Sequence, residues 1–504
     1  MNNSNSKRNA PQSLPETPEA WLETVGNHAR ESGVDVFAVG GFVRDRLLGR
    51  PFSGEIDFSV VGNAPAFAES LAKSLGIRKR VQIYRRFGTA SLRLHTIILE
   101  FASTRSESYL PESRNPDVEP ASFEEDIARR DFTVNTLAVD TQKADQVIDL
   151  HHGLRDLEAK LIRTPLDPEQ TFKDDPLRIL RAIRFAAKLD FEIEPVTLKA
   201  LRSQRKRLEI VARERINDEF FKILAVTPPS RGLMLLYETG VLEEIFPELS
   251  ILAGVEQVGQ HHHKDVLLHT LKVVDKVAEQ TERIDLRFAA LVHDIGKEST
   301  KRLEPGTGWT FHGHEHVGER MVLKMGKRYT MPEDLIRSTS RLVRLHMRPI
   351  NLQDEGVTDS AIRRLVVQAG EQIDDLLLVC RADITSGNQK KVNRYLREFD
   401  RMVERMGVIE QKDQLRQFQS PIRGDEIMAR FDLPEGPRVG LIKALIEEEI
   451  LEGRIENSRE AAEEILPKIA GSVQARTEKD VLTELRSIMR ARSEGTAPPP
   501  PPEP

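Results

Sequence analysis

The chain has 504 residues, of which 39% are hydrophobic and 31% charged, with a formal net charge of −6. Such a length exceeds what a single hydrophobic core normally supports, so we expect several domains. No apolar run approaches the ~20 residues of a membrane-spanning helix, and the N-terminal stretch lacks the apolar segment of a signal peptide. Cys380 is the only cysteine. The composition therefore excludes a membrane protein and a disulfide scaffold, and it favours a cytoplasmic protein.

The hydrophobic pattern changes along the chain. Short β-rich runs between about Val36 and Leu150 alternate with one amphipathic stretch, which predicts a small α/β or α+β module. From about Asp174 to Lys390 the apolar residues follow a 3.6-residue period, which predicts an almost entirely helical region. The turn-rich stretches 254–265 and 304–316 interrupt this region. We expect a disordered leader before the module and a disordered proline-rich tail at the end of the chain.

Three acidic residues fall in the β-rich module. Alternate residues of a strand share a face, so Glu55 and Asp57 should project together while Ile56 and Phe58 enter the core. A third acid, Glu100, lies in an apolar run where burial is costly without a nearby positive charge. A solvated sheet edge and a cation site both account for these acids. Three carboxylates suit Mg²⁺, which typically binds acids, water and substrate phosphates.

A glycine pair precedes these acids. Gly40 and Gly41 end the previous strand and would let backbone amides approach an anion, and Arg44 lies near the start of the following helix. Glycines, a basic residue and then acids, in this order along the chain, indicate phosphoryl transfer.

Two later stretches carry candidate ligand-binding residues. Asp131 and Asn135 are four residues apart and could share a helical face beside Arg130, although a helix start capped by Asp131 explains them equally. Further on, three polar residues at three-residue spacing, Asp175, Arg178 and Arg181, occupy one face of an amphipathic helix. Asp175 before a proline is also a typical N-cap.

Histidines and acids recur in the helical region. The adjacent pair His293 and Asp294 is hard to explain by packing alone, because both side chains would need partners when buried. Imidazoles with carboxylates suit a divalent transition metal. The order of His269, His293, Asp294 and Asp383 resembles the HD phosphohydrolases, and the resemblance implies that these four are metal ligands. It also implies His314 and His346 as additional ligands, with His312 or His316 as replacements for His314.

Taken together, GGFVRDRLLG, EIDFSVV, RRDFTVN and DDPLR resemble the motifs of the tRNA nucleotidyltransferase and bacterial poly(A) polymerase family, specifically the class II CCA-adding enzymes. The order H…HD…D resembles the HD phosphohydrolases. The resemblance implies an α+β fold in which a small polymerase-β-like nucleotidyltransferase head on a β-sheet precedes mostly helical parts. The implied parts are a leader (1–19), the head (20–150), a helical neck and body that selects the nucleotide and binds RNA (151–260), an HD domain (261–390), a helical RNA-binding region (391–490) and a tail (491–504).

The resemblance also implies a reaction and a role for each group of residues. C, C and A from CTP and ATP would be added to tRNA without a template, releasing pyrophosphate. Aspartate accepts and arginine donates, which matches the donor–acceptor edge of cytosine and adenine and rejects uracil and guanine. The implied roles are catalysis with two Mg²⁺ ions by Glu55, Asp57 and Glu100; triphosphate binding by Gly40, Gly41 and Arg44; ribose binding by Arg130, Asp131 and Asn135; and base binding by Asp175 and Arg178. Arg181 is a further implied nucleotide-binding residue.

Two positions depart from the family pattern. Glu55 stands where the family usually has aspartate, and Asp174 stands where it usually has glutamate. These departures keep open an HD phosphohydrolase with a degenerate RNA-binding head. Poly(A) polymerase and A-adding activity also stay open, because the motifs describe nucleotide chemistry and not the accepted primer. A non-catalytic RNA-binding protein is a further alternative. The sequence predicts no oligomeric state.

Overall fold

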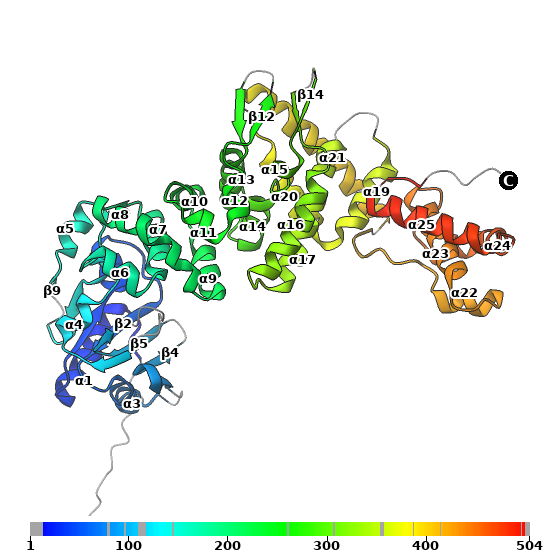
Figure 1. Ribbon diagram of the computed structural model, residues 1–504. Helices are drawn as coiled ribbons and strands as arrows, with labels where there is room; N and C mark the ends of the chain where they lie inside the picture. Colours follow the sequence, from blue (N-terminus) through cyan, green and yellow to red (C-terminus); the bar gives the residue numbers. More distant parts are fainter. Residues whose placement is uncertain are drawn as a thin grey trace, which may run out of the picture. The chain divides into compact units, whose positions relative to one another are not determined.

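The computed structural model describes residues 14–77, 81–94, 97–108, 117–143, 146–259, 262–305, 308–352, 357–386, 388–413, 415–494 and 496–498. The chain divides into two compact units, residues 1–247 and 248–504 (Figure 1). Most of the expected leader and part of the expected tail lie outside the described residues. In the parts of the chain that the structure describes, no helix combines the length and the apolar character needed to cross a bilayer.

A mixed β-sheet forms the centre of the first unit. Its strand order is β3-β4-β5-β2-β1-β8-β9, and β2 pairs with β5 in parallel while the other neighbours are antiparallel. The strands are β1 (Val36–Val39), β2 (Glu55–Val60), β3 (Gln82–Tyr84), β4 (Thr89–Arg93), β5 (Ile98–Ser103), β8 (Ala138–Asp140) and β9 (Val147–Ile148). A separate pair joins β6 (Arg105–Ser108) to β7 (Asp117–Pro120).

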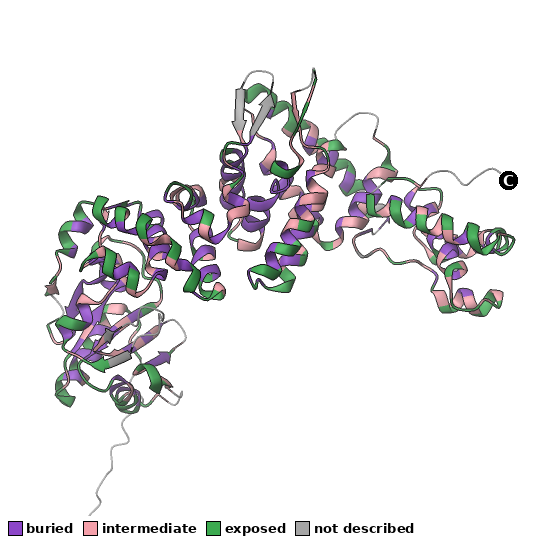
Figure 2. Cartoon of the chain, viewed as in Figure 1, coloured by how far each residue is buried: buried purple, intermediate pink, exposed green. Residues whose placement is uncertain are grey.

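The predicted alternation of faces is present in β2. Ile56 and Phe58 are buried, and the Phe58 ring stacks on Phe101 of β5 with centroids 5.0 Å apart. Buried residues run through this sheet and the helices beside it (Figure 2). Burying these rings removes apolar surface from water and holds β2 and β5 in register.

The helices of the first unit follow the apolar periodicity of the sequence. In α7, the buried residues Leu177, Leu180 and Ile183 lie on one side, and the helix packs against α9 and α10. The helices are α1 (Pro18–Ser32), α2 (Gly41–Leu47), α3 (Ala64–Ser74), α4 (Phe123–Ala128), α5 (Gly153–Glu158), α6 (Pro168–Asp174), α7 (Leu177–Leu189), α8 (Pro195–Gln204), α9 (Arg213–Leu224), α10 (Pro229–Glu238) and α11 (Val241–Ile245), with α12 (Pro247–Ser250) at the unit boundary.

The second unit is mostly helical. Its helices are α13 (Val266–Gln280), α14 (Ile284–Val292), α15 (Lys297–Thr300), α16 (His314–Arg328), α17 (Glu333–Leu345), α18 (Met347–Asn351), α19 (Asp359–Ala369), α20 (Ile373–Asp383), α21 (Gln389–Asp413), α22 (Gly424–Phe431), α23 (Pro437–Leu451), α24 (Arg459–Gln474) and α25 (Glu478–Glu494). The sheet in the first unit and these helices confirm the predicted α+β class.

Short strands interrupt the helical region. Both turn-rich stretches noted in the sequence form antiparallel pairs, β12 (Glu256–Gly259) with β13 (His262–Asp265) and β14 (Arg302–Glu304) with β15 (Gly308–Thr310). Earlier in the chain, β10 (Leu161–Ile162) pairs in parallel with β11 (Glu192–Ile193). These segments are too short to show a clear period of two, which is why the sequence pattern indicated only breaks between helices.

Candidate functional sites

The three acids of the first unit lie together. Asp57 is the register partner of Glu100 across the parallel β2–β5 pair, and Glu55 is two residues earlier on β2. One carboxylate oxygen from each acid lies within 4.8 Å of the other two. The structure thus brings together the three residues singled out in the sequence, and their role as metal ligands stays a prediction.

Burial and a neighbouring negative charge raise the pKa values of two of these acids, Asp57 and Glu100. Burial and the neighbouring Glu55 carboxylate raise the pKa of Asp57 to about 6, although Arg130 acts in the opposite direction. Burial and Glu55 also raise the pKa of Glu100. Carboxylates arranged this way gain from a hard divalent cation, because the cation replaces their repulsion with attraction. The donor set therefore fits a divalent metal of the oxygen-preferring kind.

The glycine turn brings the backbone close to this group. Gly40 has φ +74°, in the left-handed region that favours glycine, and it links β1 to α2. A Cβ atom at this position would lie 3.3 Å from Nη1 of Arg130 and 3.7 Å from Oδ2 of Asp57. A side chain at Gly40 would therefore crowd both the acids and the arginine beside them. Gly41, the first residue of α2, lies next to it.

A hydrogen-bonded chain connects the predicted ribose-binding residues. Asp131 Oδ1 accepts from Asn135 Nδ2 at 2.9 Å, and Asp131 Oδ2 accepts two hydrogen bonds from Arg181, at 2.8 and 2.5 Å. Burial disfavours the charge on Asp131, but Arg181 and the Asn135 hydrogen bond outweigh it and lower the pKa of Asp131 to about 2. Asp131 is therefore ionised at neutral pH and fixed in place.

Arg44 belongs to the same chain. It is 2% exposed, it donates to Asn135 Oδ1 at 2.6 Å, and it forms an ion pair with Asp45 at 2.8 Å. Its guanidinium carbon also lies 5.2 Å from the centre of the Phe185 ring. The structure thus shows Arg44 holding Asn135, and its predicted contact with a triphosphate stays a prediction.

The predicted base-binding residues begin α7. Asp175 Oδ1 accepts from the backbone N–H of Leu177 at 3.2 Å, so Asp175 caps the first turn although Pro176 occupies the N-cap position. Arg178 Nη2 donates to the backbone carbonyl of Arg129 at 2.7 Å. Arg178 also contributes to the low pKa of Asp131, which places it near the ribose-binding residues. Asp174 accepts a hydrogen bond from Gln170 at 2.6 Å.

A further acid, which the sequence reasoning missed, supports this site. Asp126 is 2% exposed, accepts from Ser59 of β2 at 3.0 Å, and pairs with Arg129 and with Arg130. Burial opposes its ionisation, but Arg129 and Arg130 outweigh burial and lower the pKa of Asp126. The sequence did carry a signal for these ion pairs, because residues three or four apart on a helix lie next to each other and Asp126 stands at those spacings from the two arginines.

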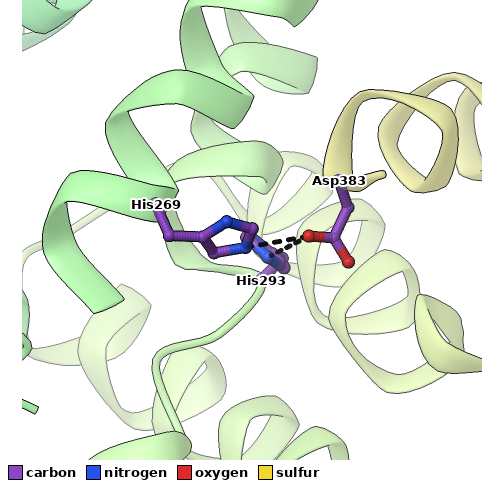
Figure 3. A group of neighbouring side chains, drawn as sticks. All are labelled: His269, His293 and Asp383. Carbon is purple, nitrogen blue, oxygen red and sulfur yellow. Dashed lines mark ion pairs between the residues drawn. The ribbon is translucent and has the colours of Figure 1, made fainter. Parts of the chain in front are cut away.

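The second unit contains the predicted histidine cluster, with His269 on α13, His293 after α14 and Asp383 at the end of α20 (Figure 3). His269 Nε2 lies 2.9 Å from Asp383 Oδ1, and His293 Nε2 lies 3.6 Å from the same oxygen. One ligand atom from each of the three residues lies within 4.8 Å of the others.

Asp294 lies between this group and a second one. Its Oδ2 faces His293 Nε2 at 3.2 Å and His269 Nε2 at 3.5 Å, while its Oδ1 faces His314 at 3.4 Å and His346 at 3.7 Å. Asp294, His314 and His346 form a second compact ligand group. The structure therefore selects His314 from the three alternatives; His312 and His316 instead face Glu304 and Glu315.

The imidazole rings are oriented by their outer nitrogens. Nδ1 of His293, His314 and His346 lies 2.7, 2.9 and 2.7 Å from a backbone carbonyl, and Nδ1 of His269 lies 3.0 Å from Thr385 Oγ1. A carbonyl can only accept, so Nδ1 carries hydrogen and Nε2 of the neutral ring presents its lone pair to the centre. This is the arrangement that metal-binding histidines use.

Burial and the charges of the histidine cluster shift the pKa values of two of its histidines in opposite directions. Burial opposes protonation of His293, but Asp294 and Asp383 raise its pKa to about 10. Burial and the nearby His293 lower the pKa of His346 to about 3. Lys297, which the sequence reasoning missed three residues after Asp294, donates to Asp294 Oδ2 at 2.6 Å. Four imidazoles and two carboxylates in two adjoining ligand groups fit divalent transition metals.

Family models match the stretches of the chain that contain the three-acid group and the histidine cluster. The family models that match are the Poly A polymerase head domain over residues 36–163, the probable RNA and SrmB-binding site of polymerase A over 190–252, and the HD domain over 266–388. A multifunctional CCA protein from Pseudomonas fluorescens is 35% identical over 311 residues, which cover 60% of this chain and 72% of the relative. The chain belongs to the tRNA nucleotidyltransferase and poly(A) polymerase family.

Relatives that are named for different activities resemble the chain to a similar degree. An A-adding tRNA nucleotidyltransferase from Deinococcus radiodurans is 32% identical over 352 residues, covering 68% of this chain and 78% of the relative. The crystal structure of a tRNA nucleotidyltransferase with a primer tRNA and an incoming ATP analog is 26% identical, with a TM-score of 0.54, and covers 75% of this chain and 99% of that one. The predicted family and HD domain are thereby confirmed.

Proposed function

We propose that this member of the tRNA nucleotidyltransferase family adds C, C and A to the 3′ end of tRNA from CTP and ATP. One observation carries the proposal: the three acids, the predicted ribose-binding residues and the predicted base-binding residues are linked through neighbouring charges. Arg130 connects the parts: burial lowers its pKa, and the charges of both Asp57 and Asp131 act in the opposite direction. The match to CCA-adding relatives supports the same reaction.

Each part of the site would handle one part of the incoming nucleotide. The Gly40–Gly41 turn and Arg44 would lie along the triphosphate. Arg130 would contact the sugar or phosphate, since its Nε is buried without a hydrogen-bond partner among the described residues. Asp131 and Asn135 would bind the ribose hydroxyls. The tRNA 3′-hydroxyl would then attack the α-phosphorus, and pyrophosphate would leave.

Glu55, Asp57 and Glu100 would hold Mg²⁺ in this site. When bound, the metal would neutralise the triphosphate and lower the pKa of the attacking hydroxyl. The closeness of the three carboxylates and the raised pKa values of Asp57 and Glu100 support a bound cation.

Asp175 and Arg178 would choose the base, with Arg181 fixing Asp131 beside them. Among the described residues, the side chains of Asp175 and Arg178 each make one hydrogen bond, to Leu177 and to Arg129, and keep other polar atoms for a ligand. An acceptor beside a donor matches cytosine and adenine, whereas uracil and guanine would leave buried groups unpaired. The protein would thus replace a nucleic-acid template.

Primer extension tests this proposal. CTP and ATP, labelled and supplied separately or together with Mg²⁺, would be offered to tRNA transcripts that lack CCA, lack only A, or are complete. We expect addition of CCA followed by a stop. Addition of A alone would indicate the activity named for the Deinococcus radiodurans relative, and unlimited addition of A would indicate a poly(A) polymerase. No incorporation would contradict a catalytic head.

The histidine cluster supports a second activity, the hydrolysis of phosphomonoesters or 2′,3′-cyclic phosphates. His269, His293, Asp294 and Asp383, with His314 and His346, would hold divalent transition metals, which would activate water. The favouring observation is that every ring in the cluster directs Nε2 inward. Hydrolysis of 2′,3′-cyclic AMP by the wild type and by Asp57→Ala, but not by Asp294→Ala, would establish it.

A single cysteine and the tRNA substrate support a cytoplasmic location.

A further inference from the structure

A cavity of about 520 Å³ lies in the C-terminal part of the second unit. It lies between α19, residues 418–425, α23 and Arg492 of α25. We call it the C-terminal cavity. Its volume falls within the range of small-molecule sites, roughly 300–1,000 Å³. The three matching family models end at residue 388, so most of its wall lies beyond them.

Among the residues that the structure describes, three that line the C-terminal cavity have side-chain polar atoms without hydrogen-bond partners. Arg364, with a side chain only 4% exposed, has buried Nε and Nη1 atoms that make no hydrogen bond to any described residue. Oε1 of Gln368 and Oγ of Ser420 are also buried and unpaired. Leaving such atoms unsatisfied costs about 1–3 kcal/mol for each group. Unpaired donors and an unpaired acceptor in one cavity therefore point to a ligand that offers both.

The charges around the C-terminal cavity are already balanced. Arg364 Nη2 donates to Glu448 at 2.6 Å and to Glu452 at 2.7 Å. Arg492 Nε donates to Glu448 at 2.7 Å, and Arg492 also pairs with Glu447. With the further lining residues Arg423, Asp425 and Lys443, four cationic side chains thus face four carboxylates. A strongly anionic ligand therefore gains little electrostatic attraction in this cavity. A neutral group can still form hydrogen bonds there as both donor and acceptor.

The walls of the C-terminal cavity supply apolar surface as well. Phe418, Val367, Ile422 and Leu451 line it, and Phe418 packs against the core formed by α22, α23, α24 and α25. Lys443, which is exposed, contributes a cation to the lining. A flat heterocycle could lie against the aromatic ring, and a phosphate attached to it could meet the lysine.

We propose that the C-terminal cavity binds a nucleobase. A ring nitrogen or carbonyl of the base accepts from Arg364, an exocyclic amine donates to Gln368 Oε1, and the ring lies against Phe418. The base belongs to a free nucleotide or to an unpaired nucleotide of an RNA. Both sources offer the same chemistry, and the experiment separates them. This site is independent of the nucleotide site in the first unit.

Hydrogen exchange followed by mass spectrometry locates binding within the intact chain. AMP, CMP and ribose 5-phosphate are added separately at millimolar concentration without Mg²⁺, and a tRNA transcript is added in a parallel arm. We expect AMP or CMP to slow exchange at least threefold in peptides covering 364–368 and 418–424, and ribose 5-phosphate to have no effect. Protection by the tRNA alone would assign the base to RNA. Equal protection by ribose 5-phosphate would overturn the nucleobase assignment.

Two variants test the contacts. Gln368→Leu combined with Ser420→Ala removes the unpaired acceptor and hydroxyl, and Val367→Phe fills the cavity while leaving Arg364 with its glutamate partners. Both should abolish protection of the two segments, whereas nucleotide protection of peptides covering 36–60 in the first unit should persist. Gln411→Leu on the exposed face of α21 is the matched control and should change nothing. Absence of protection by every probe would show that the cavity holds water only.

Discussion

The ion pair between Asp131 and Arg181 connects the segment that follows α4 to α7. Replacing Asp131 by asparagine keeps the size of the side chain and removes its charge. Asp131 is 8% exposed, and both hydrogen bonds from Arg181 reach the same oxygen. We therefore expect Asp131→Asn to destabilise the first unit.

The pKa of Asp131 gives the magnitude. The difference between about 2 in the folded protein and the ordinary 3.8 corresponds to roughly 2.5 kcal/mol. The Arg181 side chain is 35% exposed, so solvent screening reduces this figure to about 1–2 kcal/mol. Because the folded pKa is lowered, the contribution is complete above about pH 4 and disappears as the pH falls toward 2.

Tryptophan fluorescence can isolate the first unit in the intact chain. The protein has 2 tryptophans, and Trp21 of α1 is 1% exposed. In a Trp309→Phe background, Trp21 alone reports urea unfolding of the first unit. We expect the free energy of unfolding to be about 1–2 kcal/mol lower for Asp131→Asn than for its parent at pH 7, and the difference to shrink between pH 4 and pH 3.

Two results would refute this reasoning. Equal stability at pH 7 would mean that the ion pair contributes nothing. A difference that stays constant down to pH 3 would mean that the asparagine disturbs packing and not charge. Asp35→Asn, at an exposed position of the same unit, is the control and should behave as its parent.

Four further predictions concern activity and metal content. Glu55→Asp should keep or raise the rate of nucleotide incorporation, since the family usually has aspartate there; a tenfold loss would show that the site requires glutamate. Asp126→Asn should raise the KM for CTP about tenfold with a smaller change in kcat, because Arg129 and Arg130 lose their ion pairs with Asp126. An unchanged KM would exclude this positioning role. Arg178→Ala should increase incorporation of UTP and GTP relative to CTP and ATP, and unchanged selectivity would exclude Arg178 from base choice. His314→Ala and His346→Ala should each reduce bound Ni²⁺ from two equivalents to one, measured by elemental analysis in excess Mg²⁺; two equivalents in either variant would contradict a second metal position.

Local patterns in the sequence predicted the faces of elements but not their neighbours. Period-two alternation was enough to place Glu55 and Asp57 on one face of β2. That Glu100 joins them depends on the parallel pairing of β2 with β5, which no local pattern specifies. In the same way, the histidine spacing allowed three choices near residue 314, and the position of α16 decided among them.

Arg44 shows a second limit of sequence reasoning. Its position after two glycines indicated a phosphate contact, yet its partner Asn135 lies 91 positions away in the chain. Such long-range partners depend on tertiary packing. Asp126 was missed for a different reason, since its pairing with Arg129 and Arg130 is local and readable, and an acid on a short helix is ordinarily solvated.

The parallel pairing of β2 and β5 also affects how the protein is made. A parallel pair needs a crossover, and here the described part of the crossover contains α3, β3 and β4. A growing chain that ends before β5 already carries Glu55 and Asp57, but it has no Glu100 to place beside them. The three-acid group therefore forms only when the ribosome has released β5 and the strand has docked beside β2. A partly synthesised head would have no complete cation site and would stay inactive toward nucleotides until its sheet is finished.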